Sequence, residues 1–243
     1  MNIRDKIVVI TGGTSGIGYE LVKQLSPMNR VIVIAKDQNK LHKIQEEFTN
    51  VDTYKAELSN LTEVEDVADK IVKKYPSVDV LINNAAIQHT PILPSNDFVY
   101  ENIHKEVTIN FTSVCCLTYL LLGSLSNADK AIILNVNSGL ALAPKTSSAI
   151  YCATKAALNN FTLSLRYQLE DSQIAVQQVF LELVDTGMTS GRGQNKLSSK
   201  NAAEKILNGI EKGILDHDIG KVKLLRLMLR IAPKIVRRIM KQN

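Results

Sequence analysis

The chain has 243 residues, of which 45% are hydrophobic and 22% are charged, as is typical of a globular protein. Its formal net charge is +5, yet residues 221–243 hold eight basic and no acidic side chains, so the remainder carries 5 − 8 = −3. The basic charge is therefore confined to the tail, and a nucleic-acid-binding surface spread over the whole chain is not expected.

The N-terminal segment and the cysteines bear on the compartment. The opening "MNIRDKIVVITGG" lacks the basic start and longer apolar stretch of a signal peptide, and no apolar run approaches the roughly 18 residues of a membrane-spanning helix. Three cysteines without paired spacing do not suit a disulfide framework. The four histidines are scattered, without the close spacing of metal ligands. We expect a cytoplasmic protein without a metal site.

Short apolar runs alternate with longer amphipathic segments along the chain. The pattern predicts strands at 6–13, 30–36, 51–58, 78–86, 130–138 and 174–183, and helices at 16–27, 39–48, 62–75, 101–123 and 149–171. This alternation predicts a doubly wound, Rossmann-type α/β domain: a parallel sheet with helices on both faces. We place the domain at residues 1–220 and a basic amphipathic helical extension at 221–243.

The first predicted strand ends in the glycine-rich segment "TGGTSGIG", residues 11–18. Glycine tolerates unusual backbone angles and lets a phosphate approach the main chain. The helix that follows offers free N–H groups and a partial positive charge at its N-terminus. A glycine-rich turn between a strand and a helix therefore predicts a dinucleotide site, here with the spacing G-x-x-x-G-x-G.

Tyr151 and Lys155 lie four residues apart in "YCATK", which places them on one face of a predicted helix. Alone, they fit an amphipathic helix with a half-buried tyrosine and a solvated lysine. The sharper interpretation is a proton-transfer pair, because a nearby ammonium favours the phenolate and lowers a tyrosine pKa that is otherwise about 10.

The glycine-rich segment, "NNAA" (83–86), "NVNSGLA" (135–141) and "YCATK" (151–155) together resemble the short-chain dehydrogenase/reductase family. The resemblance extends from Lys6 to about Met188, and the longer phrases "NVNSGLA" and "YCATKAALNNFTLSLRYQL" are most similar to DltE-type oxidoreductases. It implies an enzyme that transfers a hydride between NADP or NAD and a small carbonyl or alcohol substrate. It also implies a homodimer or homotetramer that binds no nucleic acid.

The resemblance assigns roles to matching positions. Tyr151 would be the general acid/base, and Lys155 would lower its pKa and hold the nicotinamide ribose. Ser138 would hydrogen-bond the substrate oxygen, and Asn110 would hold a water that links Lys155 to solvent. "NNAA" would line the adenosine side of the pocket. The residues expected at the cofactor are Gly12, Thr14, Ser15, Gly16, Ile17, Gly18, Lys36, Glu57, Leu58, Asn84, Tyr151, Lys155, Val184 and Thr186.

The sequence departs from the family pattern at three places. Glu57, in "KAELS", stands where the family usually has Asp near the adenine. Ala86 ends "NNAA" where the family usually has glycine, a difference of one methyl group. In "LELVDTGM", Glu182 and Leu183 stand where the family often has Pro-Gly. The wall beside the nicotinamide is then expected to differ, and the added carboxylate is expected to disfavour anionic substrates.

The end of the second predicted strand bears on the choice of cofactor. NAD enzymes commonly carry an acidic residue there, which binds the ribose 2′-OH. Ala35 occupies that position and Lys36 follows, a residue that can meet the 2′-phosphate of NADP. Asp37, one residue further on, would suit NAD. We favour NADP and keep NAD as the alternative.

The C-terminal tail has apolar residues at helical spacing with basic residues between them. Pro233 is expected either to kink this helix or to begin a second one. We expect the tail to pack on the domain or on a partner subunit, with contact to a membrane surface or an acidic partner as the alternative. The polar segment 187–200 predicts a mobile loop over the substrate.

Other functions remain open on the same fold. The main alternative is a nucleotide-sensing regulatory protein with little turnover. The presence of Asn110, Ser138, Tyr151 and Lys155 together argues against it, because a sensor does not need an acid/base pair. A sugar-nucleotide epimerase or dehydratase is disfavoured, because that related branch has a different glycine spacing and a longer C-terminal domain. An enzyme of envelope lipid metabolism would give the basic tail a purpose.

Overall fold

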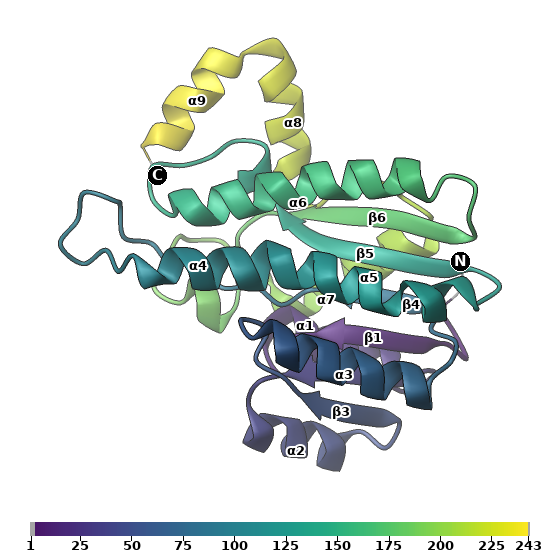
Figure 1. The fold of residues 1–243 in the computed structure, drawn as a ribbon. Coiled ribbons are helices and arrows are strands. Elements are labelled where there is room, and N and C mark those ends of the chain that lie inside the picture. The colour runs from purple at the N-terminus through teal and green to yellow at the C-terminus, as the bar shows by residue number, and fades with distance from the viewer. Residues whose placement is uncertain (1–2, 243) are drawn as a thin grey trace.

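Seven parallel strands form the central sheet (Figure 1), in a computed structural model that describes residues 3–242. Their order is β3-β2-β1-β4-β5-β6-β9. The strands are β1 (Ile7–Thr11), β2 (Arg30–Ala35), β3 (Val51–Lys55), β4 (Val80–Asn83), β5 (Ala131–Ser138), β6 (Ile174–Leu181) and β9 (Asp216–Asp218). The apolar runs of the inner strands are continuous because helices cover both faces of the sheet. In β1, for example, Val8, Val9 and Ile10 are all fully buried.

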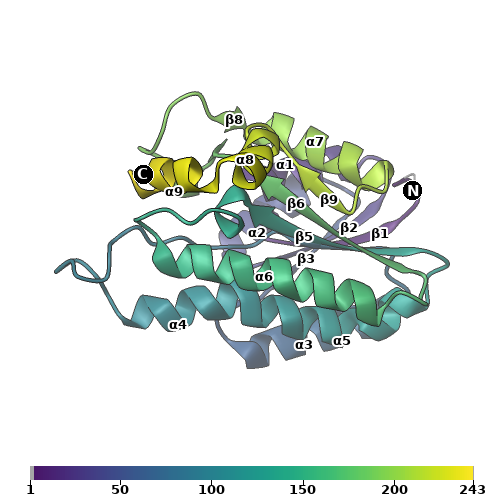
Figure 2. The same ribbon diagram turned by 90° about the horizontal axis from the view of Figure 1, so that it is seen from above.

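The helices form one layer on each side of the sheet (Figure 2). One layer holds α1 (Gly16–Leu25), α2 (Gln38–Glu47) and α7 (Ser199–Glu211). The other holds α3 (Leu61–Lys74), α5 (Ser113–Ser126) and α6 (Ala149–Gln168). Neighbouring strand residues alternate between the two cores, as Val9 and Ile10 do. The predicted doubly wound α/β architecture is confirmed.

A continuous helical stretch precedes β5. It consists of α4 (Glu101–Val107), a wide π-turn (Thr108–Thr112) and α5. By length and composition, Glu101–Ser126 is apolar enough to cross a membrane, contrary to the sequence expectation, but half of its apolar window is buried inside the domain. It packs against α3, β4, β5 and α6. Its apolar character is that of a core helix, and its π-turn carries Asn110.

Some elements differ from the sequence prediction. The predicted strands 51–58 and 78–86 end at Lys55 and Asn83, after which the chain turns out of the sheet toward the cleft described below. The helix α7 and the strand β9 were not predicted. The strand β9 reads Asp-His-Asp and has no apolar alternation, because it is a short strand at the sheet edge. A separate parallel pair, β7 (Val184–Asp185) and β8 (Leu197–Ser198), follows β6.

The C-terminal tail is a hairpin of two helices, α8 (Val222–Ile231) and α9 (Pro233–Lys241), which Figure 1 shows above α6. Pro233 occupies the first turn of α9, so it begins a second helix rather than kinking one. Arg226 of α8 makes a two-pronged ion pair with Asp218 of β9, at 2.6 and 2.8 Å. Thr146 donates a hydrogen bond of 2.6 Å to the Lys241 carbonyl. The hairpin is thus tied to the domain near both ends.

Candidate active site

A cleft of about 1270 Å³ lies where the chain leaves the carboxyl ends of β1, β2, β4, β5 and β6. The strand order reverses between β1 and β4, the kind of switch point at which doubly wound sheets bind ligands. Every site residue predicted from the sequence lines this cleft except Asn110, which lies behind its wall. The residues predicted from the sequence are therefore gathered in one cleft, and the α8–α9 hairpin adds a wall that the sequence did not predict.

The glycine-rich turn forms one end of the cleft. Gly12 and Gly16 have φ angles of +70° and +53°, which L side chains rarely adopt. A methyl group on Gly18 would overlap the carbonyl oxygen of Gly12, so this contact requires glycine. Ser15 occupies the N-cap of α1 but makes no side-chain capping bond. The first N–H groups of α1 are therefore open to an anionic ligand.

The end of β4 is bonded to this turn. The hydroxyl oxygen of Thr11 accepts hydrogen bonds from the N–H groups of Asn84 and Ala85, both at 3.0 Å, and the Asn84 amide donates to the Thr11 carbonyl at 3.0 Å. Asn83 instead points into the sheet and donates to Asn135 at 2.9 Å. Only Asn84, Ala85 and Ala86 of "NNAA" line the cleft, so the expectation that the whole motif lines it was wrong for Asn83.

The residues that bear on cofactor choice lie just after β2 and β3. The Asp37 carboxylate caps α2 and accepts from the Lys40 N–H at 3.1 Å. The ammonium of Lys36 lies 3.7 Å from the Glu57 carboxylate. Lys40 also lines the cleft, and sequence reasoning missed it. The sequence feature that could have indicated Lys40 was its position four residues after Lys36.

Ser138 and Tyr151 meet across the site. Ser138 ends β5, Tyr151 lies in the first turn of α6, and the Ser138 side chain lies close enough to the phenol to act on its pKa. Ser148, immediately before α6, has a φ of +60°, a conformation that strains a residue other than glycine. Such strained residues cluster at functional sites, and this one sets the direction in which α6 leaves the loop.

Burial shifts both members of the Tyr151–Lys155 pair toward their neutral forms. It raises the pKa of Tyr151 to about 12, although the Ser138 side chain acts to lower it. Burial also lowers the pKa of Lys155 to about 8. The Lys155 ammonium donates to the Val136 carbonyl at 2.8 Å and lies 5.7 Å from the centre of the Tyr151 ring. The expected lowering of the Tyr151 pKa by Lys155 is not seen: desolvation of the phenol raises this pKa, and Lys155 is not among the groups that act on it.

Asn110 is fully buried in the π-turn. Its amide donates to the Ile87 carbonyl at 2.8 Å and to the Thr154 hydroxyl at 3.2 Å, and its oxygen accepts from the Ile87 N–H at 2.8 Å. The side chain thus joins the helix, the loop after β4 and α6. A water held by Asn110 would consequently have to use its backbone rather than its amide.

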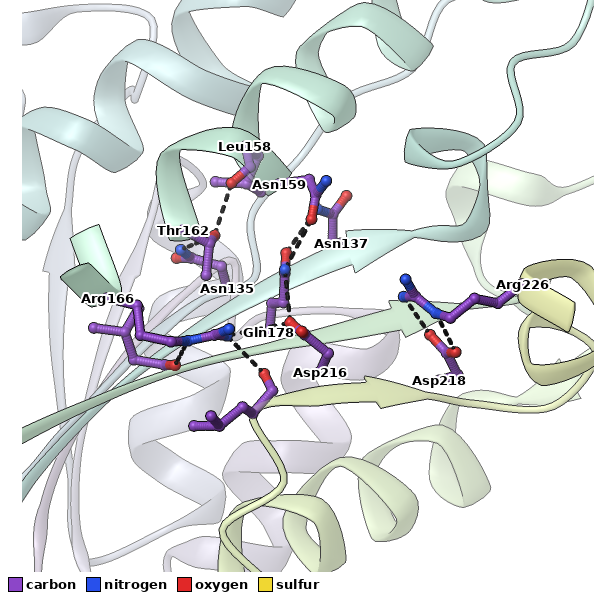
Figure 3. A network of polar contacts seen from close by, with 12 residues as sticks. Asn135, Asn137, Leu158, Asn159, Thr162, Arg166, Gln178, Asp216, Asp218 and Arg226 are labelled. Atoms are coloured by element: carbon purple, nitrogen blue, oxygen red, sulfur yellow. Dashed lines mark hydrogen bonds and ion pairs between the residues drawn. The ribbon is translucent and has the colours of Figure 1, made fainter. Parts of the chain in front are cut away.

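A polar network behind the site fixes α6 against the sheet (Figure 3). Asn135 of β5 donates to the Thr162 hydroxyl of α6 at 2.9 Å. Gln178 of β6 donates to Asn159 of α6 and to Asp216 of β9, both at 2.8 Å. These side chains hold the helix with Tyr151 in register with the strand that ends at Ser138. Sequence reasoning missed Gln178 and Asp216, which belong to no recognised motif.

The substrate end of the cleft is closed by the segment after β7 and by the tail. Arg192 donates to the Gln88 side chain at 2.9 Å, across the cleft from its own loop. Leu225 and Met228 of α8 add an apolar wall. The predicted loop 187–200 contains a 3-10 turn (Gly187–Thr189) and the short strand β8, and only part of it lines the cleft. Its mobility and its position over a substrate stay predictions.

No metal site accompanies this cleft in the part of the chain that the structure describes. There, no group of three or more His, Cys, Asp or Glu side chains is placed to hold a metal ion.

Comparisons with known proteins agree with this geometry. The family model for short chain dehydrogenases matches residues 6–197. The chain is 32% identical to the uncharacterized oxidoreductase DltE of Bacillus subtilis (strain 168), over 93% of this chain and 92% of that protein. It is 28% identical to an NADP-dependent 3-hydroxy acid dehydrogenase of Schizosaccharomyces pombe, over 93% and 88% of the two chains.

Solved structures show the same fold. A short chain dehydrogenase from Burkholderia cenocepacia J2315 in complex with NADP has a TM-score of 0.88 at 22% identity, over 99% of both chains. A short chain dehydrogenase/reductase from Burkholderia phymatum in complex with NAD has a TM-score of 0.86 at 18% identity, over 98% of this chain and 96% of that one. With the family model and the DltE similarity, the chain therefore belongs to the short-chain dehydrogenase/reductase family of oxidoreductases.

Proposed function

We propose that the protein transfers a hydride between NADP(H) and a carbonyl/alcohol substrate, with Tyr151 as general acid/base. The observation that carries the proposal is that Ser138, Tyr151 and Lys155 line one cleft together with the glycine-rich turn. When bound, the nicotinamide supplies or accepts the hydride. Ser138 orients the substrate oxygen, and Tyr151 gives its proton to that oxygen in reduction or takes it in oxidation.

The remaining residues support this proton transfer. A phenol with a pKa of about 12 is neutral at physiological pH, which suits Tyr151 as a donor in reduction. Lys155, with a pKa of about 8, is mostly an ammonium at pH 7 and would hold the nicotinamide ribose. We assign Asn110 to the water link through its backbone, since its amide is already bonded to Ile87 and Thr154.

The glycine-rich turn fits a dinucleotide, since Gly18 leaves no room for a methyl group and α1 begins without a side-chain cap. We propose that NADP is preferred over NAD. Lys36 and Lys40 both line the adenosine end, whereas Asp37 is engaged in capping α2. The test is equilibrium binding of NADPH and NADH to wild type and to Lys36→Gln/Lys40→Gln. The double variant should lose affinity for NADPH but not for NADH, and a wild type that binds NADH more tightly would contradict the proposal.

The activity itself is tested with a panel of carbonyl compounds, NADPH and NADH, on wild type and Tyr151→Phe. Turnover should fall by about 10² to 10⁴-fold in this variant while NADPH binding stays unchanged. Tyr167→Phe is the matched control, because Tyr167 is an exposed tyrosine on the same helix. Turnover retained in Tyr151→Phe refutes the assigned acid. Tight cofactor binding without turnover on any substrate favours the sensor instead.

We also propose that the outer surface of the α8–α9 hairpin contacts an anionic membrane surface. Its exposed apolar side chains Leu227, Ile231 and Ile235 do not line the cleft, and the basic tail has no acidic residue to compensate its charge. Apolar residues flanked by basic ones suit a lipid interface with anionic headgroups.

The double variant Leu227→Gln/Ile231→Gln tests this contact and spares the cleft wall. It should reduce binding to phosphatidylglycerol vesicles and leave the sedimentation of the protein unchanged. Vesicle binding equal to wild type refutes the membrane contact, and a smaller oligomer in the variant assigns the surface to a second copy of the chain. The expected homodimer or homotetramer stays a prediction that the same sedimentation measurement tests.

A further inference from the structure

Two basic side chains lie at the substrate end of the cleft and have no part in the proposed chemistry. Lys145 comes from the loop before α6, and Arg192 comes from the segment after β7. Both are half-buried, and both line the same cleft as Tyr151. Two separate loops therefore bring positive charge to the place where a substrate would meet the phenol.

Neither cation is neutralised by an acidic side chain. Within the described residues 3–242, no carboxylate lies within 4.0 Å of Lys145 or Arg192. Arg192 donates only to uncharged acceptors, the Gln88 side chain and the Met188 carbonyl. Burial lowers the pKa of Lys145, and the charge of Arg192 lowers it further. The two cations thus lie close enough to repel each other, and an anion between them would relieve that repulsion.

The carboxylates nearest this region are already placed elsewhere. Glu106 is buried beside His89, 3.3 Å from its ring nitrogen, and does not line the cleft. Glu182 does line the cleft, but its carboxylate packs against Gly220 at the start of α8, where even a methyl group would overlap it. The sequence expectation that Glu182 disfavours anionic substrates therefore overlooked the two cations that line the cleft with Tyr151.

The wall next to these cations is apolar. Leu183 and Met188 are 40% and 39% exposed and line the cleft, and Leu225 and Met228 of α8 line it from the tail. Such a surface favours an aliphatic chain, since burying methylene groups away from water is favourable. The pocket thus combines a charged position and a long apolar surface around one phenol.

We propose that Lys145 and Arg192 form a subsite for an anionic group, a carboxylate or a phosphate, carried by the same molecule as the reacting carbonyl or alcohol, whose aliphatic chain lies along α8. The inference rests on the proposed function, because it uses the same phenol. The substrate is then an amphipathic acid, and Lys145 and Arg192 determine the specificity for it.

The experiment compares three probes that share one alcohol and one chain length: β-hydroxydecanoate, its neutral methyl ester and β-hydroxydecyl phosphate. Oxidation with NADP+ is measured for wild type, Lys145→Met, Arg192→Gln and the double variant. The matched control is Lys223→Gln, which removes an exposed charge from α8 outside the cleft lining. Binding of each probe to the NADP+-loaded protein is measured by calorimetry, and NADP+ affinity is measured separately.

Wild type should favour an anionic probe over the ester by about tenfold or more in kcat/KM, the size of one charge-assisted hydrogen bond. Each cleft variant should lose more kcat/KM on the anionic probes than on the ester, mainly through KM, and Lys223→Gln should behave as wild type. The better anionic probe distinguishes a carboxylate from a phosphate.

Three results would overturn the subsite: equal wild-type affinity for ester and anions, equal losses on all three probes in the variants, or weaker NADP+ binding in Arg192→Gln. The last would assign Arg192 to the cofactor. Failure of the proposed function looks different, because anion binding would then persist in calorimetry without turnover.

Discussion

Replacing Lys155 by methionine should change how the stability of the protein depends on pH. The ammonium of Lys155 is 3% exposed, and burial lowers its pKa from 10.5 to about 8. Below pH 8 the folded protein must therefore hold a buried charge that the unfolded chain solvates freely. Lys155→Met removes this charge and keeps a similar side-chain length.

The size of the effect follows from the pKa. The difference 10.5 − 8 = 2.5, at about 1.36 kcal/mol per pKa unit, makes the charge destabilising by about 3 kcal/mol at pH 7. Between pH 8 and 10.5 the unfolded chain binds more protons than the folded one, so the stability of the wild type rises with pH in that window. Relative to Lys155→Met, it should gain about 2 kcal/mol between pH 7 and pH 10. The lost hydrogen bond to Val136 shifts the two curves by a constant and does not change this slope.

Urea unfolding of both proteins without cofactor, at several pH values from 7 to 10, measures the difference. Lys223→Met, which removes an exposed ammonium, is the control and should give a curve parallel to wild type. If the curves of wild type and Lys155→Met are also parallel, Lys155 is not held as a buried charge, and the reasoning on its pKa is refuted.

Three further variants have definite expected outcomes. Gly18→Ala should weaken NADPH binding at least about tenfold, because the added methyl displaces the Gly12 carbonyl; fluorescence titration measures it, and unchanged affinity would contradict the close contact. Asn135→Ala should lower the free energy of unfolding by about 2–4 kcal/mol, because its buried partners on β4 and α6 lose hydrogen bonds; a loss under about 1 kcal/mol would show that water replaces them. Arg226→Met should loosen the hairpin and raise hydrogen exchange in α8, whereas exchange unchanged there would mean that apolar packing alone holds it.

The sequence predicted a residue's place in the site best where the local backbone permits only one type of residue or fixes the spacing of two residues. Gly12, Gly16 and Gly18 were found because the turn tolerates no side chain there. Tyr151 and Lys155 were found because helical spacing places them on one face. These signals are local, and so each is visible in a few consecutive letters.

Residues that act through the tertiary fold were missed. Lys145 and Arg192 line one cleft only because two loops far apart in sequence come together there. Gln178 of β6 donates a hydrogen bond to Asp216 of β9, and β9 has no apolar pattern from which the strand could be predicted. The direction of the Tyr151 pKa was also missed, because spacing reports which charges are near and says nothing of how deeply the phenol is buried.

The proposed subsite and the acid are electrostatically coupled, which makes a last prediction possible. The groups that act on Tyr151 besides burial are Ser138, Cys152, Glu106 and Arg192, and of these Arg192 lowers the phenol pKa by its positive charge. Lys155 faces the ring as well.

An anion bound at Arg192 would offset that charge and raise the pKa of the phenol, so the bound acid would keep Tyr151 protonated to higher pH than the neutral ester does. In the reduction direction, the alkaline limb of kcat should therefore lie at higher pH for β-oxodecanoate than for its methyl ester. Arg192→Gln should remove this difference, since the charge to be offset is gone. Identical alkaline limbs in wild type would show that the anion does not reach Arg192, whereas a difference that survives Arg192→Gln would place its origin in another group. The segment with Arg192 would then both select the substrate and set the pKa of Tyr151, the acid that protonates this substrate.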